Sequence, residues 1–447
     1  MEEWRPPAVE QTKIDDDQSP RQGENETDTS TEPLLDSDQT VGRYVDPLFL
    51  ATIVFGLSSW IMVNGVFAEL PELVRHVPEG YRIFAWCSGA VALGNIAPLV
   101  FLKCFQEKPT STTDPSEPRT QNVYKRNFTR DWFAVAFILI SGIVSCLLLA
   151  TLWDRTVVVH RNGKENWDFS LPLILAVFLG GMADCLSSVV YWPLISYLDK
   201  KYINALVIGE TATALLSNVL ASIQSVSFGH APLFSPSTYF FSITGILVLS
   251  AIASVFVLRA VARHDIGGTT NAGQVEVPKP SRALTWKYLI RKPFMISQCM
   301  ISCLENAFLT SIPPLLYREV QHGDVLNAWG VRLSLILACL AVLFSHGKGS
   351  YHRKLNLSSV AILCTFIAIC SILYKIVDLP LAITGVIAWI FAKIILVYSK
   401  MREFQKEQDS HGKHGVSSES FRFGGVAIQI GSIIGSVLFS VPAAIWG

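Results

Sequence analysis

The chain has 447 residues, of which 50% are hydrophobic and only 16% are charged, and it contains 25 Phe and 11 Trp. This composition is too apolar for an ordinary soluble domain. The formal net charge of zero gives no support to nucleic-acid binding.

The first segment, residues 1–46, is predicted to be a disordered acidic cytoplasmic tail. Residues 1–38 hold twelve acidic residues against three basic ones, with few hydrophobic side chains and many Ser, Thr, Pro and Asp. No charged segment followed by a short apolar core marks a cleavable signal peptide. We therefore expect the first membrane helix to act as its own signal.

The remaining hydrophobic residues fall into blocks of about 20 residues, the length that crosses roughly 30 Å of hydrocarbon as a helix. We expect an all-α polytopic membrane protein. Its eleven predicted spans are 47–68, 82–104, 132–153, 171–197, 203–226, 237–258, 293–317, 326–345, 357–374, 379–399 and 424–446.

The distribution of basic residues predicts the orientation. With the N-terminus inside, the cytoplasmic segments hold 26 of the 36 Lys and Arg residues and the outer segments hold 6. Because basic residues accumulate on the cytoplasmic side, we expect a cytoplasmic N-terminus and an extracellular C-terminus.

The longest internal hydrophilic stretch predicts a division into two half-bundles. Residues 259–292 are rich in Gly, Thr, Pro and bases, as in a flexible cytoplasmic linker. They separate an N-terminal six-helix half-bundle, 47–258, from a C-terminal five-helix half-bundle, 293–447.

Several chemistries have no sequence support. The nine Cys residues lie in or beside apolar blocks, which argues against a disulfide framework. Cys299 and Cys303 are one helical turn apart, but no His or further Cys accompanies them, so small buried side chains explain them better than a metal site. The chain has no nucleotide-binding loop, His-rich cluster or nucleophile elbow. We expect no metal, no cofactor and no enzymatic activity.

Uncharged polar residues inside the spans predict an internal cavity. Trp60 and Asn64 are four residues apart and share one helical face, which suits a planar ligand that forms hydrogen bonds. Each Asn is equally well explained by a hydrogen bond between helices, so the concentration in five spans carries the prediction. The other members are Asn95, Thr211, Thr213, Asn218, Asn306, Thr310 and Gln429.

Ionisable residues inside the spans extend this set. Asp184, Glu210, Glu305 and Lys393 are placed well inside the membrane, and Arg332 nearer its outer surface. A charge at mid-bilayer costs about 2.5 to 3.5 kcal/mol, so these residues must face one another or a wet cavity. Structural pairing, such as Glu305 with Lys393, competes with substrate contact or proton linkage.

The end of the first span is expected just before Pro71. This would place Glu69 and Glu72 at a solvated outer mouth, where Glu69 joins the proton-linked or structural charges. In the last span, Gly431 and Gly435 form a pair of small residues that brings helix backbones together.

Seven motifs in matching order, from about residue 47 to the C-terminus, resemble the riboflavin transporters of the solute carrier superfamily. They are "SSWIMVNGVFAELPELV" (58–74), "PEGY" (78–81), "VALGN" (91–95), "YWPLISYL" (191–198), "SPSTYFF" (235–241), "ENAFLTSIPP" (305–314) and "GGVAIQIGSIIG" (424–435).

The resemblance implies eleven spans, a fold similar to equilibrative nucleoside transporters and the major facilitator group, and riboflavin uptake across the plasma membrane without ATP. Trp60, Asn64, Glu69, Asn95, Asn306 and Gln429 match family motif positions. The chain departs from the family where Asp184, Glu210, Glu305 and Lys393 replace uncharged residues, and residues 331–344 lack an Asn-Pro pair.

We therefore expect alternating access around a midplane site for riboflavin, with protonation of Glu210 or Glu305 able to modulate transport. Two alternatives remain: a facilitator of the same architecture for a nucleoside or another planar heterocycle, and a membrane receptor or scaffold. The expected substrate-binding residues are Trp60, Asn64, Asn95, Glu210, Thr213, Asn306, Thr310 and Gln429.

Overall fold

The computed structural model describes residues 46–105, 119–159, 167–195, 198–225, 232–268, 293–318, 322–345, 379–410 and 418–446. These residues belong to one unit, Val45–Gly447. The predicted ninth span, 357–374, lies outside the described residues, as do the predicted tail up to residue 45 and most of the predicted linker.

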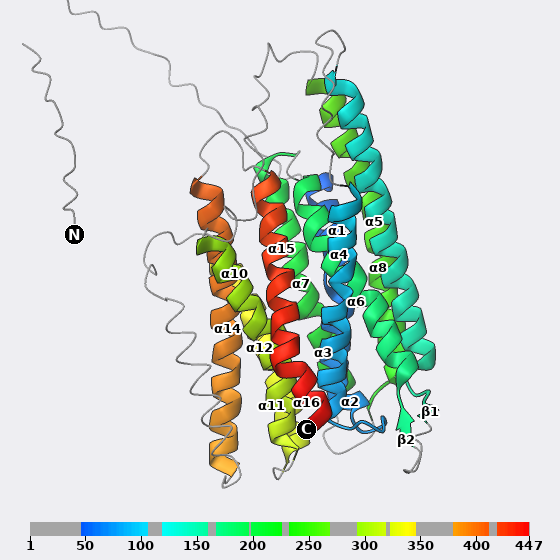
Figure 1. The fold of residues 1–447 in the computed structure, drawn as a ribbon, viewed down its shortest axis with the longest axis vertical. Coiled ribbons are helices and arrows are strands. Elements are labelled where there is room, and N and C mark those ends of the chain that lie inside the picture. The colour runs from blue at the N-terminus through cyan, green and yellow to red at the C-terminus, as the bar shows by residue number, and fades with distance from the viewer. Residues whose placement is uncertain are drawn as a thin grey trace, which may run out of the picture. The chain divides into compact units, whose positions relative to one another are not determined.

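The described residues form a bundle of long helices (Figure 1). Nine of their helices are long and apolar enough to cross a membrane, or up to ten when one bent pair counts as a single span. The all-α polytopic architecture is therefore confirmed. The helices are α1 (Pro47–Leu57), α2 (Ile61–Leu73), α3 (Arg82–Gly94), α4 (Ile96–Phe105), α5 (Arg119–Leu152), α6 (Leu171–Ile195), α7 (Lys200–Gln224), α8 (Pro236–Gly268), α10 (Pro293–Cys303), α11 (Leu309–Tyr317), α12 (Gly323–Ser345), α14 (Leu379–Ser410), α15 (Ser418–Gly435) and α16 (Val441–Trp446), with π-helical turns η1 (Leu304–Phe308) and η4 (Ser436–Ser440).

The first span is a broken helix, and the prediction of one continuous helix over 47–68 is wrong. α1 and α2 meet at 51°. The hydroxyl groups of Ser58 and Ser59 donate to the carbonyl oxygens of Phe55 and Gly56, a local bond that competes with helix continuation.

One face of α6 satisfies the polar groups of this break. The Asp184 carboxylate accepts from the backbone N–H of Val63 at 2.9 Å, and the Ser187 hydroxyl donates to the Ser59 carbonyl at 3.1 Å. The Tyr191 hydroxyl lies 2.9 Å from that of Ser58. Residues three and seven positions apart share a helical face, so α6 holds the break in place.

Glycine residues set the closest helix crossings. A Cβ at Gly431 would collide with the Cys299 carbonyl, and one at Gly435 would lie 2.5 Å from the Cys303 carbonyl. The prediction that this glycine pair brings backbones together is confirmed, because α15 packs on α10 at these positions. Cys299 and Cys303 have free thiols on the facing helix.

The helices α5 and α8 run side by side (Figure 1) and contain 34 and 33 residues, more than a membrane requires. Helix α8 continues ten residues into the stretch expected as a linker. At the opposite end lies an antiparallel hairpin of β1 (Val157–Val159) and β2 (Trp167–Phe169), which the all-α prediction omitted. The side chain of Glu79 accepts from the backbone N–H of Ser170, beside β2.

Helices from the first and second halves of the chain pack together around the bundle centre. Helices α2 and α7 contact α12, α6 contacts α15, and α3 contacts α11, η4 and α16. The interior is therefore built from both halves of the sequence. The division into two half-bundles stays a prediction.

Candidate functional site: a polar cavity inside the bundle

A cavity of about 230 Å³ lies where these helices meet. Its walls come from α2, α3, α6 and α7 on one side and from η1, α11, α12, α14 and α15 on the other. Seven of the eight predicted substrate-binding residues line it: Trp60, Asn64, Asn95, Glu210, Asn306, Thr310 and Gln429.

The helix break positions the first wall. Trp60 is the last residue before α2, and Asn64 follows one turn later, so both reach the cavity. The Asn64 side chain donates to the Thr213 hydroxyl at 2.8 Å, and this hydroxyl donates to the Glu210 carbonyl at 2.6 Å. Thr213 itself is fully buried and does not line the cavity. Its hydroxyl orients Asn64, and its contact with substrate stays a prediction.

A π-helical turn builds the facing wall. η1 carries the adjacent residues Glu305 and Asn306, and both line the cavity. Pro313 and Pro314 follow in α11, where each lacks the N–H that would continue the helical ladder. Such π-helical turns are common at functional sites.

Asn306 belongs to a hydrogen-bond network that joins three helices and η1. Its side-chain amide nitrogen donates to the Ser432 hydroxyl at 2.8 Å, and its backbone carbonyl accepts from the hydroxyls of Thr310 at 2.8 Å and Ser88 at 3.1 Å. The Ser88 hydroxyl also lies 2.9 Å from that of Ser440. The side chain of Asn306 is thereby fixed before any ligand arrives.

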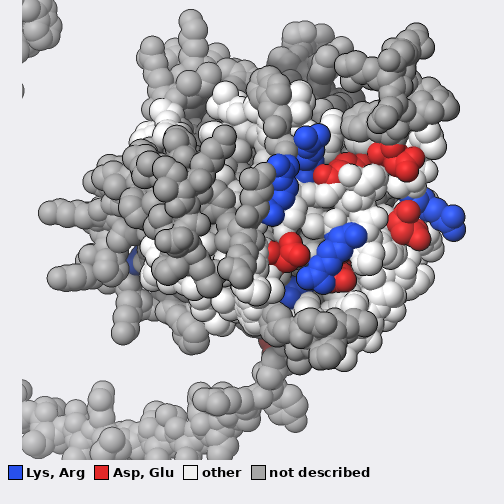
Figure 2. Space-filling view, turned by 90° about the horizontal axis from the view of Figure 1, so that it is seen from below, with Lys and Arg blue, Asp and Glu red and all other residues white. Residues whose placement is uncertain are grey.

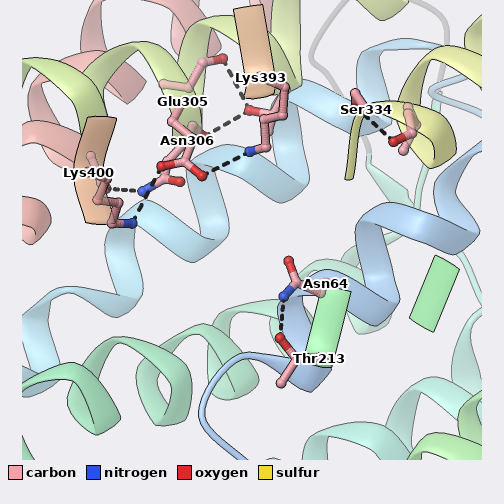
Figure 3. Close-up of polar contacts among 11 residues, drawn as sticks. Asn64, Thr213, Glu305, Asn306, Ser334, Lys393 and Lys400 are labelled. Carbon is pink, nitrogen blue, oxygen red and sulfur yellow. Dashed lines mark hydrogen bonds and ion pairs between the residues drawn. The ribbon is translucent and has the colours of Figure 1, made fainter. Parts of the chain in front are cut away.

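Charged side chains meet at one end of the cavity (Figure 3). The Lys393 ammonium group lies 3.1 Å from one carboxylate oxygen of Glu305, and that of Lys400 lies 3.4 Å from the other. The expected pairing of Glu305 with Lys393 is therefore present, and Lys400 adds a second cation. Figure 3 shows this cluster across an open space from Asn64 and Thr213.

Three acceptor oxygens in the cavity wall have no partner among the described residues. They are Asn95 Oδ1, Glu210 Oε1 and Gln429 Oε1. The amide nitrogens of Asn95 and Gln429 donate to the carbonyls of Ala92 and Cys185, which fixes the orientation of both side chains. A buried polar group without a partner costs about 1 to 3 kcal/mol, so each of these buried oxygens would be stabilised by a hydrogen-bond donor that reached it.

Glu69, which the sequence placed at a solvated outer mouth, is fully buried, and Glu72 is 7% exposed. Helix α2 continues through Pro71 to Leu73 because its end packs inside the bundle. The Gln224 amide donates to the Glu69 carboxylate at 2.9 Å. Neither glutamate lines the cavity.

Three further polar residues lie outside the cavity lining. Asp184 is 1% exposed and binds the helix break, and Asn218 donates to the carbonyl of its own helix at Ala214. Arg332 is buried in α12, with its Nε unpartnered among the described residues. Asp184 and Arg332 were predicted not to face lipid, and both are buried inside the bundle.

Sequence reasoning missed several cavity residues. Lys400 was assigned to a cytoplasmic segment because the span was ended at 399, whereas α14 continues to Ser410. The sequence did contain a signal for Lys400, because it lies seven residues after Lys393, and residues seven apart lie on the same face of a helix. The other missed polar residues and aromatic residues are Ser88, Ser188, Trp192, Ser432 and Phe67.

The end of the bundle that carries the hairpin has a mixed charge. In Figure 2, acidic and basic side chains lie side by side among uncharged residues on the coloured part of this face. The Arg75 guanidinium lies 3.6 Å from the carboxylate of the buried Glu72. The Tyr81 hydroxyl donates to Asp324, so the segment before α3 is joined to the start of α12.

Comparisons with known proteins address the family directly. Residues 47–232 match the model of "Solute carrier family 52, riboflavin transporter". A human relative, "Solute carrier family 52, riboflavin transporter, member 2", is 24% identical over 89% of this chain and 94% of its own length.

The resemblance to the riboflavin transporter family is confirmed. Human member 1 of this solute carrier family 52 is 30% identical over 48% of this chain and 46% of its own length. "Riboflavin transporter rft-1" of Caenorhabditis elegans is 27% identical over 53% of this chain and 51% of its own. Among solved structures, the xylose transporter XylE from E. coli has a TM-score of 0.49 at 12% identity, covering 88% of this chain and 90% of that one.

Proposed function

We propose that this chain is a plasma-membrane transporter that takes up riboflavin by alternating access without ATP hydrolysis, with its N-terminus in the cytoplasm and its C-terminus outside. The observation that carries the proposal is a cavity lined by polar residues inside the helix bundle. The relatives of this chain are named as riboflavin transporters. A cavity with walls from both ends of the chain is where a two-sided transporter binds its cargo.

Riboflavin fits the chemistry of these walls. Its flat isoalloxazine ring stacks against an aromatic face such as Trp60, which lines the cavity. Its ribityl hydroxyls supply donors for the unpartnered oxygens of Asn95, Glu210 and Gln429. Each such bond removes a desolvation cost that the empty cavity carries.

The lysine side chains of the cavity already have a partner. Lys393 and Lys400 both contact Glu305, and all three residues line the cavity. The lysines therefore need no anionic group of a ligand, which suits a neutral vitamin. The lining residues therefore support a neutral, hydroxyl-rich heterocycle.

Uptake of labelled riboflavin by cells that express the chain tests the proposal. We expect uptake that excess unlabelled riboflavin blocks and uridine does not. Asn64→Ala is expected to reduce uptake about fivefold, since one hydrogen bond contributes on the order of 1 kcal/mol, with equal protein at the cell surface. Uptake blocked better by uridine would indicate a nucleoside facilitator, and no uptake despite surface expression would contradict the proposal.

A further inference from the structure

The charged cluster of Glu305, Lys393 and Lys400 has an ordered pattern of hydrogen-bonding groups. Lys393 and Lys400 lie on one face of α14, and Glu305 on η1 stands between them, with one carboxylate oxygen toward each lysine. All three side chains line the cavity. Along the wall the order is therefore donor, acceptor, donor.

Each member of the cluster keeps hydrogen-bonding capacity beyond the ion pairs. A carboxylate has about four lone-pair sites, and an ammonium group has three donors. The contacts within the cluster use one site on each Glu305 oxygen and one donor on each lysine. The cluster can therefore bind a ligand without losing its own pairing.

We propose that this cluster recognises the imide edge of the riboflavin pyrimidinedione ring, an inference that rests on the proposed function. That edge presents carbonyl oxygen, N3–H and carbonyl oxygen, which is the complement of lysine, glutamate and lysine. Glu305 accepts from N3–H, and the two ammonium groups donate to the flanking carbonyls. Hydrogen bonds to charged groups are roughly twice as strong as neutral ones.

This orientation uses the rest of the cavity. Asn64 lies across the open space from the cluster (Figure 3), and Trp60 lines the same cavity one turn before it. A ring whose imide edge meets Glu305 therefore points its body toward the wall of α2. The unpartnered oxygens of Asn95, Glu210 and Gln429 remain for the ribityl hydroxyls.

An anionic ligand is the competing explanation for two lysines at one site. A phosphate monoester could use the spare donors of the lysines, but it would lie beside Glu305, whose carboxylate can only accept and repels a second anion. The contacts do not favour this either, because both lysines already pair with Glu305. The imide edge, in contrast, satisfies all three groups of the cluster at once.

Equilibrium binding to the purified full-length chain tests the inference, read by quenching of flavin fluorescence. The probes are riboflavin, 3-methylriboflavin, in which a methyl group replaces the N3 hydrogen, and riboflavin 5′-phosphate. We expect 3-methylriboflavin to bind at least about tenfold more weakly than riboflavin, because a site built to hydrogen-bond a group rejects the analogue that lacks it. The 5′-phosphate is expected to bind no more tightly than riboflavin.

The variant Glu305→Ala separates hydrogen bonding from steric exclusion. It should weaken riboflavin binding and bring the ratio of the two affinities close to one. Arg402→Gln is the matched control, because Arg402 donates to Tyr398 on the same helix and lies outside the cavity lining; its ratio should equal that of the native chain. If Glu305→Ala does not fold, Glu305→Ser, which shortens the side chain and removes the carboxylate, takes its place, and a native ratio near one overturns the inference without any variant.

The outcomes separate this inference from the proposed function. A native ratio near one, or a ratio that persists in Glu305→Ala, overturns the imide assignment while riboflavin uptake stands. Tighter binding of the 5′-phosphate that is lost in Lys400→Gln overturns it in favour of an anion site. Discriminating binding without uptake supports the imide assignment and contradicts transport, and no flavin binding by the folded chain overturns both.

Discussion

At the scale of single residues, Asp184 shows how a charge inside the membrane is used structurally. Its carboxylate accepts from the Val63 N–H at 2.9 Å, directly after the break between α1 and α2. The first N–H groups of a helix have no partner in their own helix, and no water is available in hydrocarbon to replace one. Asp184 thus stabilises the start of α2, the helix that carries Asn64.

Replacing Asp184 is expected to destabilise the protein, and by more when the new side chain cannot accept the hydrogen bond of the Val63 N–H. Asp184→Ala leaves the Val63 N–H without an acceptor and should lower the free energy of unfolding by about 1 to 3 kcal/mol. Asp184→Asn keeps an oxygen at the same place and should lower it less. Thermal unfolding in detergent, followed by Trp fluorescence, measures the order of the midpoints.

The control is Thr151→Ala, since the exposed Thr151 hydroxyl bonds only to carbonyls of its own helix. A midpoint for Asp184→Ala equal to that of the control would contradict the structural role. Stable Asp184→Asn protein whose uptake has lost its pH dependence would instead restore the proton-linked hypothesis.

At the scale of elements, close crossings depend on the absence of a side chain. Helix α3 meets α6 where Gly94 lies against the Gly181 backbone, and α1 meets α7 where Gly209 lies against Gly56. α15 meets α10 at Gly431 in the same way. These contacts determine the distance between the helices that form the cavity walls.

Gly431→Ala is expected to push α15 away from α10, because its methyl group would collide with the Cys299 carbonyl. Overpacking of this kind costs about 1 to 3 kcal/mol. Gly245→Ala is the matched control, since a Cβ at Gly245 in α8 has nothing within 4 Å. Thermal unfolding and surface expression measure both variants. Equal midpoints for the two would show that this crossing is not tight.

The elements also show what could be predicted from sequence. Apolar length located ten spans that the structure describes, because the thickness of the hydrocarbon fixes that length. It did not locate the break at Ser58–Trp60, because the partners of the break, such as Asp184, lie more than 120 residues away along the chain. The sequence also did not predict that α14 continues to Ser410. Hydropathy reports the length of an apolar stretch and not the length of the helix that contains it.

At the scale of the whole molecule, the polar residues in the spans predicted a cavity, and most of them line one. The exceptions were decided by tertiary contacts. Thr213 lies about one turn after Glu210 in sequence, yet its hydroxyl accepts from Asn64 on another helix. Glu69 was placed in solvent from Pro71, whereas Gln224 of α7 gives it a buried partner.

The central claim is that this chain alone moves riboflavin through the cavity that Asn64 lines. The most direct measurement is counterflow in liposomes that contain only the purified chain, with unlabelled riboflavin inside, labelled riboflavin outside and no ATP. We predict transient accumulation of label that Asn64→Ala reduces about fivefold and that Thr151→Ala leaves unchanged. Folded protein that gives no accumulation above empty liposomes, or equal accumulation with Asn64→Ala, would contradict this account.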